Sequence, residues 1–361
     1  MKITKSTDLY LPENFRDGRP INQIILVCDV DGVIRDCCNS DADPRIVVAI
    51  KELIKEHQID IAFISGTPAT QRSALEIWRR GHTTLDKAIA EPLANELKKE
   101  EISIYGALGG QRMRDFNHIE ILDEYPIEIV FELSKILLHA FFHEIDCTGT
   151  QEQKELTRKL KAEVETLTLK DKNQSPQITP NEFAEIALTI RSKIDPRFRL
   201  VSYGALIETL TSNPPWGITN SVKWLEKELS SKELLISKLP KEQRQIAMGL
   251  GSCDGFGFNF LMVSKVNKSL TIKKHIEERC HLYPDALIIT IGDTQVDFPM
   301  HQHAHLAYHV GKEHVWSSQA LPQCMLVQDH LGFDSQHVKG TLHVLKLIKE
   351  GVGKPISEWN I

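Results

Sequence analysis

Short apolar runs alternate with amphipathic stretches over the first 110 residues. The apolar runs are rich in β-branched residues, as in Ile24-Ile25-Leu26-Val27, and predict strands that are buried on both faces. We expect such strands at 24–28, 59–64 and 102–105. Apolar residues recur at helical spacing over 44–56, and weaker helical patterns lie near 70–79 and 85–99. Strands that alternate with helices predict an α/β fold with a doubly wound, mostly parallel sheet.

The alternation stops near residue 120 and resumes near residue 265. Between these points, helices and strands follow no fixed order, which is typical of an α+β domain. The expected helices lie at 127–142, 151–168, 181–193, 219–229 and 240–248, the expected strands at 198–211 and 256–266, and an expected loop at 170–180. Beyond 265 we expect helices at 268–280 and 339–349 and strands at 286–291 and 305–310. The sequence therefore predicts an N-terminal arm (1–20), a Rossmann-like core (21–118 and 263–361) and an inserted α+β domain (119–262).

Composition and charge exclude several classes of protein. Of 361 residues, 41% are hydrophobic and 25% are charged, a balance that excludes disorder for most of the chain. The formal net charge of −6 argues against nucleic acid and anionic membranes as partners. No apolar run approaches the roughly 20 residues of a membrane span, and the N-terminus is too polar for a signal peptide. Seven scattered cysteines fit a reducing, cytoplasmic location, with Cys37-Cys38 either two ordinary thiols or a redox or soft-metal pair.

Two acidic pairs follow predicted strands at the edge where ligands bind in open α/β sheets. Asp29 and Asp31 follow the first strand, and Asp293 and Asp297 follow the strand at 286–291. If both strands belong to one sheet, four carboxylates converge, and such a group needs a counter-charge. Ligands that are all oxygen favour Mg²⁺ over zinc. The sequence therefore predicts a magnesium site here.

Other residues fit a phosphoryl group. Ser65, at the end of the second strand, offers a hydroxyl, with Thr67 as the alternative. The backbone N–H of Gly66 can approach a phosphate oxygen because glycine has no side chain. Lys268 offers a positive charge at the start of a predicted helix. A metal and fixed positive groups around the phosphoryl oxygens are what phosphoryl transfer requires.

These four segments resemble the four motifs of the haloacid dehalogenase (HAD) superfamily of phosphatases and phosphomutases. The resemblance implies that Asp29 is the nucleophile that forms an aspartyl-phosphate and that Asp31 is the general acid and base. It implies that Ser65 and Lys268 hold the phosphoryl group. It further implies that Asp29, the Asp31 backbone carbonyl, Asp293 and Asp297 bind Mg²⁺.

The place of the insertion resembles the type C2 cap of that superfamily. This subgroup includes trehalose-6-phosphate, sucrose-phosphate and mannosyl-3-phosphoglycerate phosphatases and phosphomannomutase. The segments 106–112 and 340–345 are similar to the glycine-containing loop before such caps and to the end of trehalose- and sucrose-phosphatase chains. The resemblance implies a small phosphorylated substrate.

We therefore expect a Mg²⁺-dependent phosphomonoesterase that acts on a small phosphorylated metabolite, with a sugar phosphate as the favoured class. A phosphomutase, a non-catalytic phospho-ligand-binding regulator and a protein phosphatase are the alternatives. The His301-x-His303-x-His305 run is interpreted as surface histidines, with a zinc site as the alternative. Trp216 and the glycine-rich 251–257 loop are either turn and packing elements or substrate contacts, and Asp254 and Lys223 are possible contacts. The sequence does not predict the oligomeric state or the specific substrate.

Overall fold

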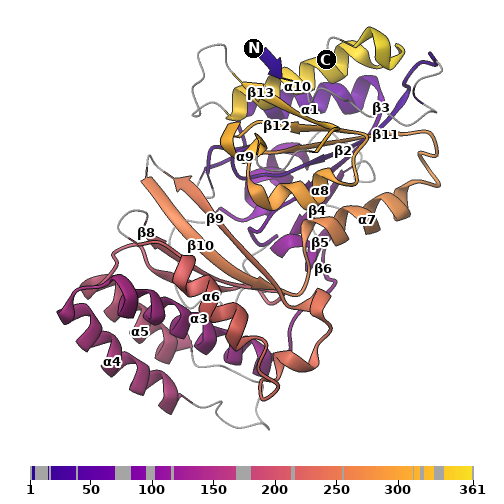
Figure 1. Cartoon of the computed structure of the whole chain (residues 1–361). Helices are drawn as coiled ribbons and strands as arrows, with labels where there is room; N and C mark the ends of the chain where they lie inside the picture. The colour runs from indigo at the N-terminus through magenta and orange to yellow at the C-terminus, as the bar shows by residue number, and fades with distance from the viewer. Residues whose placement is uncertain are drawn as a thin grey trace. The chain divides into compact units, whose positions relative to one another are not determined.

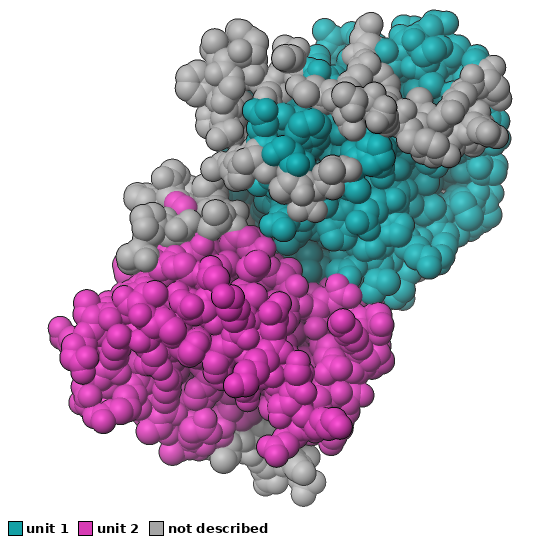
Figure 2. Space-filling model, viewed as in Figure 1, with its two compact units in different colours: residues 1–70, 82–120, 267–361 teal, residues 71–81, 121–266 magenta. Residues whose placement is uncertain are grey.

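The chain forms two compact units, which Figure 2 distinguishes by colour. Residues 1–70, 82–120 and 267–361 belong to the first unit, and residues 71–81 and 121–266 belong to the second. This computed structural model describes residues 2–4, 15, 18–37, 40–69, 83–94, 102–114, 118–167, 180–212, 216–253, 256–311, 313–317, 321–328 and 337–359. Among these residues, no helix has both the length and the apolar character that a membrane crossing requires.

A nine-stranded sheet is the centre of the first unit. Its strands, in spatial order, are β1 (Lys2–Thr4), β13 (Cys324–Gln328), β12 (Leu306–His309), β11 (Leu287–Gly292), β2 (Gln23–Cys28), β3 (Gln58–Ile64), β4 (Ile102–Gly106), β5 (Gln111–Arg114) and β6 (His118–Ile121). The six strands from β13 to β4 are parallel, whereas β1 and β5 pair with this group in antiparallel fashion. The prediction of a mostly parallel sheet is therefore confirmed.

Helices cover both faces of this sheet (Figure 1). Helices α1 (Pro44–Glu56) and α10 (His337–Gly351) lie on one face, and α7 (Lys268–Arg279) and α8 (Phe298–His301) lie on the other. Successive residues of a strand point to opposite faces, so Ile24 and Leu26 pack with α1 and α10, while Ile25 and Val27 pack with α7 and α8. This explains why β2 reads as a continuous apolar run. Shorter helices are α2 (Glu91–Ala94), which follows a π-helical turn (Asp86–Ala90), and α9 (Glu313–Ser317).

The order of the strands changes direction between β2 and β11. The chain proceeds from β2 to β3 and β4 on one side, and from β11 to β12 and β13 on the other. Cys28, the last residue of β2, lies opposite Ile291 of β11. The loops that follow these two strands therefore begin side by side, at the switch point where open α/β sheets bind ligands.

The second unit is an α+β domain with a separate hydrophobic core. Its antiparallel sheet consists, in order, of β7 (Arg199–Ser202), β8 (Leu206–Ser212), β10 (Phe256–Ser264) and β9 (Gln245–Cys253). Its helices are α3 (Ile127–Thr148), α4 (Gln151–Thr166), α5 (Pro180–Lys193) and α6 (Thr219–Glu228). They pack on one face of the sheet, where Ile207 and Leu261 join the helices in one core (Figure 1).

Several predicted elements differ from the structure. The single strand expected at 198–211 is a hairpin, because the chain turns at Gly204, whose φ is +74°. The helix expected at 240–248 is wrong: after a 3₁₀ turn (Lys241–Gln243), the chain forms β9, which pairs with β10 along its whole length. Strands β1, β5, β6 and β13 were not predicted. The helix expected at 70–79 and the loop expected at 170–180 lie almost wholly outside the described residues.

Candidate active site

A tight turn after β2 positions the first acidic pair. The Asp29 N–H donates to the Ile291 carbonyl across a distance of 2.9 Å, which extends the pairing with β11 by one residue. The Gly32 N–H then donates to the Arg35 carbonyl at 2.7 Å, so the turn closes within four residues. Gly32 has a φ of +83°, a left-handed conformation that glycine adopts without a steric penalty. The turn directs the carboxylates of Asp29 and Asp31 to different sets of partners.

Asp29, Asp293 and Asp297 form one cluster. Each offers a carboxylate oxygen, and these three atoms lie within 4.8 Å of one another. Asp297 is fully buried, and its Oδ2 accepts hydrogen bonds from the backbone N–H groups of Asp293 and Thr294, at 2.9 and 2.8 Å. The turn after β11 therefore orients Asp297 through its own backbone. The structure brings together these three sequence-predicted metal ligands.

Lys268, the first residue of α7, joins the same cluster. Its Nζ lies 2.6 Å from Asp29 Oδ1 and 2.5 Å from Asp297 Oδ1, and its side chain is 3% exposed. The side chain of Asn267 caps the helix by accepting the Leu270 N–H at 2.8 Å. Burial alone would lower the pKa of Lys268, but the two carboxylates raise it well above its ordinary value. Lys268 is therefore a fixed cation.

The charges of this cluster do not balance within the described residues. Burial and the nearby Asp297 raise the pKa of Asp29 well above its ordinary value, which reflects the cost of several carboxylates in one buried place. With all three carboxylates ionised, the single ammonium of Lys268 leaves a charge of −2. One divalent cation compensates that charge, and ligands that are all oxygen fit Mg²⁺. The residues present therefore fit the predicted metal.

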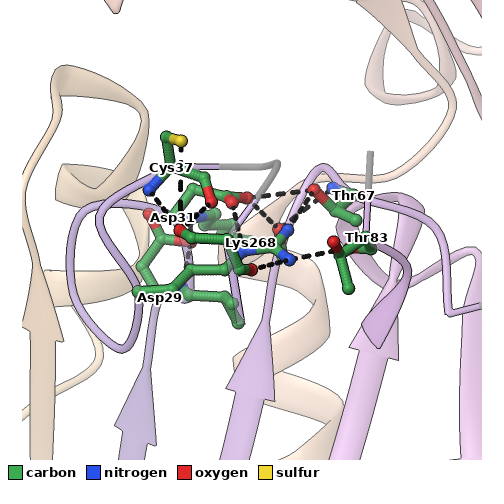
Figure 3. Close-up of polar contacts among 10 residues, drawn as sticks. Asp29, Asp31, Cys37, Thr67, Thr83 and Lys268 are labelled. Carbon is green, nitrogen blue, oxygen red and sulfur yellow. Dashed lines mark hydrogen bonds and ion pairs between the residues drawn. The ribbon is translucent and has the colours of Figure 1, made fainter. Parts of the chain in front are cut away.

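Asp31 lies in a second network beside the cluster, which can be followed with Thr67 and Thr83 in Figure 3. Its Oδ1 accepts from Arg35 Nε at 2.7 Å, and its Oδ2 accepts from Ser65 Oγ at 2.9 Å and Thr67 Oγ1 at 3.0 Å. Burial would raise the pKa of Asp31, but the charge of Arg35 and these hydrogen bonds hold it below its ordinary value. Both oxygens of this carboxylate are occupied.

The loop with Ser65 and Gly66 follows β3, and a second loop supports it. The N–H of Leu108 donates to the Ser65 carbonyl at 2.8 Å, and the N–H of Ala107 donates to the Thr67 carbonyl at 3.1 Å. Ala107 and Leu108 have φ values of +49° and +59°, which are unusual for residues other than glycine. The Leu108 carbonyl in turn accepts from Thr271 Oγ1 at 2.6 Å. The 107–109 loop thus connects the Ser65 loop with α7, which positions Lys268.

Sequence reasoning missed three residues of this site and misplaced another group. Arg35 and Thr271 were not selected as candidates, and Gly32 was not identified as the residue that spaces the two acidic loops. For Arg35 the available signal was an arginine four residues after Asp31 within a turn. His301 is not on the surface as expected: it is fully buried, and burial lowers its pKa to about 3. The three histidines contact separate partners, with His301 on Thr290, His303 on Ser269 and His305 on the Ile288 N–H.

The remaining candidates from the sequence lie in the second unit, near Arg35 or outside the described residues. Trp216 is buried in the core of the second unit, which agrees with the packing interpretation. Lys223 is exposed on α6. Cys37 is half-buried, whereas Cys38 and Asp254 lie outside the described residues.

Comparisons with known proteins give similarities at low identity. No protein-family model matches the chain, and no curated protein sequence matches it. Among solved structures, the chain is similar to a trehalose-6-phosphate phosphatase from Aspergillus fumigatus (12% identity, TM-score 0.43), with 96% of this chain and 99% of that chain covered. It is also similar to a haloacid dehalogenase-like hydrolase from Bacteroides thetaiotaomicron (16% identity, TM-score 0.43; 90% and 99% covered). A haloacid dehalogenase-like hydrolase from B. subtilis has 12% identity and a TM-score of 0.46, with 89% and 98% covered.

Proposed function

We propose that this chain is a HAD-type, Mg²⁺-dependent phosphomonoesterase that acts through an aspartyl-phosphate. The observation that supports this most directly is the Asp29 carboxylate, which lies beside Lys268 Nζ and within one cluster with Asp293 and Asp297. A nucleophile for phosphorus needs neighbouring positive charge, because the attacked group is an anion. Lys268 supplies such charge at 2.6 Å from Asp29 Oδ1.

The chemistry proceeds in two displacements. An oxygen of the Asp29 carboxylate attacks phosphorus, and the bond to the substrate oxygen breaks. Asp31 is 31% exposed and takes up a proton from solvent when the phosphoryl anion lies beside it. It gives this proton to the leaving oxygen. Asp31 then removes a proton from water, the resulting hydroxide attacks phosphorus, and the Asp29 carboxylate leaves. The Ser65 hydroxyl turns its one proton from Asp31 Oδ2 to a phosphoryl oxygen when substrate binds, while Thr67 Oγ1 stays on Asp31. The Gly66 N–H binds a second phosphoryl oxygen, and Lys268 stabilises the charge that spreads over them.

Asp29, Asp293, Asp297 and the Asp31 backbone carbonyl are the proposed ligands of Mg²⁺. When bound, the ion offsets the charge on the phosphoryl oxygens and that of the acidic cluster. The net charge of −2 on the three carboxylates and Lys268 supports this assignment.

A small phosphorylated metabolite is the proposed substrate, and a sugar phosphate is the favoured class. We assign residues 119–262 as a C2-type cap because this α+β insertion interrupts the core between Ser65 and Lys268. A cap would exclude bulk water from the aspartyl-phosphate during turnover.

Hydrolysis of p-nitrophenyl phosphate tests the proposal. We expect turnover with Mg²⁺, loss of turnover with EDTA, and recovery when excess Mg²⁺ is added back. Asp29→Asn should be inactive, whereas Asp285→Asn, a change at an exposed carboxylate, should retain full activity. Wild-type protein without turnover on this ester and on a panel of sugar phosphates would refute the proposal. Turnover that requires a sugar bisphosphate would instead indicate a phosphomutase.

A further inference from the structure

Arg35 is a fully buried cation whose donors fix several segments at once. Its Nε donates to Asp31 Oδ1 at 2.7 Å, and its Nη2 donates to Thr67 Oγ1 at 3.2 Å. Its Nη1 donates to the backbone carbonyls of Ser40 and Thr83, at 3.1 and 2.7 Å. Four of the five N–H groups of the guanidinium therefore have protein acceptors. This leaves Arg35 little freedom to move.

The exposures of the two partners differ in an informative way. The Arg35 side chain is 0% exposed, whereas the Asp31 side chain is 31% exposed. The Asp31 carboxylate is thus partly exposed to solvent, whereas the Arg35 guanidinium that binds it lies in the protein interior. Its other oxygen is held by two hydroxyls, those of Ser65 and Thr67. The plane of the carboxylate is fixed from both oxygens.

The donors of Arg35 reach two groups of acceptors. The contacts of Nη1 with two backbone carbonyls already tie the turn to the Ser40 and Thr83 segments. The contacts of Nε and Nη2 instead converge on Asp31 and on Thr67, which itself donates to Asp31. Arg35 therefore contacts the Asp31 carboxylate directly and also through the Thr67 hydroxyl.

We propose that Arg35 is a positioning residue that holds Asp31 in the orientation for proton transfer to the leaving oxygen. This inference rests on the proposed phosphatase function. Arg35 itself does not contact substrate, because its side chain is fully buried. A misplacement of about 1 Å of a catalytic group is enough to cost about 10²-fold in rate, and general acid catalysis supplies about 10²- to 10⁴-fold.

Two esters whose leaving alcohols differ in acidity distinguish a loss of Asp31 positioning from general damage to the fold. p-Nitrophenol is acidic and leaves without a proton, whereas p-nitrobenzyl alcohol is an alkyl alcohol of similar size that needs one. For both phosphate esters, kcat/KM covers only the steps up to release of the alcohol, so it does not include hydrolysis of the aspartyl-phosphate. Loss of folded protein lowers both values of kcat/KM by the same factor. Loss of acid positioning lowers the value for the benzyl ester selectively.

The experiment compares the two esters in wild type and four variants. For Arg35→Met we expect kcat/KM to fall about 10²-fold on p-nitrobenzyl phosphate and less than about 3-fold on p-nitrophenyl phosphate. Asp31→Asn should show the same selectivity, and Arg35→Lys, which keeps the charge but lacks the planar fork, should be intermediate. Arg45→Met is the matched control: this arginine is exposed and paired with Asp43, and both values should stay unchanged.

Equal losses on the two esters in Arg35→Met would overturn the inference and leave the proposed function standing. A wild type that hydrolyses only p-nitrophenyl phosphate would also overturn it, because no acid would then be in use. A wild type without activity on either ester or on sugar phosphates would refute the proposed function, and the inference with it. If Arg35→Met does not fold, Thr67→Val replaces it: this change removes one hydroxyl from Asp31 and should give a smaller loss with the same selectivity.

Discussion

Gly32 and Asp293 approach each other so closely that a side chain at position 32 would displace the Asp293 carboxylate. A β-carbon on Gly32 would lie 2.2 Å from Asp293 Oδ2, and the φ of +83° at Gly32 adds a second restriction. Gly32 lies in the turn after β2, and Asp293 follows β11. The contact therefore sets the spacing of the two loops whose carboxylates form the acidic cluster.

Gly32→Ala should displace Asp293 and lower activity by about 10²-fold or more, because a shift of about 1 Å in a catalytic group has that effect. Phosphatase assays and Mg²⁺ titration measure the change. Gly353→Ala is the control, since Gly353 has the same φ of +83° but nothing within 4 Å of the added β-carbon. It should lose only about 1 kcal/mol of stability and no activity. Equal activity in both variants would contradict the assigned role of the contact.

Lys268→Met removes the cation of the acidic cluster. Turnover should fall by at least about 10²-fold, and the metal-free protein should be less stable by about 3 kcal/mol, because Asp29 and Asp297 lose a buried partner. Mg²⁺ should bind more tightly than in wild type, since the charge on the cluster changes from −2 to −3. Calorimetric titration and thermal unfolding measure both effects. Lys273→Met, at an exposed lysine on the same helix, should behave as wild type. Weaker Mg²⁺ binding in Lys268→Met would argue against this charge balance.

Thr271 connects α7 with the 107–109 loop through one hydroxyl. Thr271→Val keeps the shape but leaves the Leu108 carbonyl without this donor, so the free energy of unfolding should fall by about 1–2 kcal/mol. Activity should fall as well, because the loop also holds the backbone of Ser65 and Thr67. Thr271→Ser, which keeps the hydroxyl, should retain most of both. Urea unfolding and kcat measurements give the comparison, and equal effects of the two substitutions would exclude a role for the hydrogen bond.

His305 makes the fold sensitive to acid. Burial lowers its pKa to about 4, and its Nδ1 accepts the Ile288 N–H at 3.0 Å, which requires the neutral ring. A depressed pKa in the folded state means that its stabilising effect is present above the unfolded-state pKa of about 6.5 and is lost as pH falls towards 4. The free energy of unfolding should fall by roughly 2 kcal/mol over this interval because of this group. Urea unfolding at pH 7 and pH 4.5 should show a smaller decrease in His305→Gln than in wild type. The exposed His281→Gln should leave the decrease unchanged, and an unchanged decrease in His305→Gln would exclude this histidine as the cause.

The core elements were predictable because their patterns had one interpretation. β2 is buried on both faces, and its short, β-branched apolar run indicated a strand of a covered sheet. α1 has a capping Asp43, a proline at its start and an apolar stripe along one face. The sequence mispredicted β9 as a helix because this segment is a strand only by pairing with β10. Gly249 of β9 contacts the ring of Phe260, and a β-carbon there would be 2.5 Å from the ring. A helical pattern cannot reveal such a tertiary contact.

The residues of the candidate site also include some that the local sequence predicts and some that depend on contacts made only in the fold. Asp29 and Asp293 were predictable because each follows an apolar strand, and carboxyl ends of parallel strands share an edge. The role of Arg35 depends on a turn that folds back within four residues, and that of Thr271 on a loop 163 residues away in sequence. These contacts come from the fold rather than from local spacing. The burial of His301 was missed for the same reason, since its partner Thr290 belongs to β11.

The identity of the nucleophile is the central claim, and trapping the covalent intermediate tests it most directly. Protein quenched in acid during turnover of p-nitrophenyl phosphate with Mg²⁺ is digested, and its peptides are analysed by mass spectrometry. We predict one phosphoryl group on the peptide with Asp29, located on that carboxylate, sensitive to hydroxylamine and absent from Asp29→Asn. Phosphorylation of a different residue, or rapid turnover with a pre-steady-state burst and no labelled Asp29, would contradict the account.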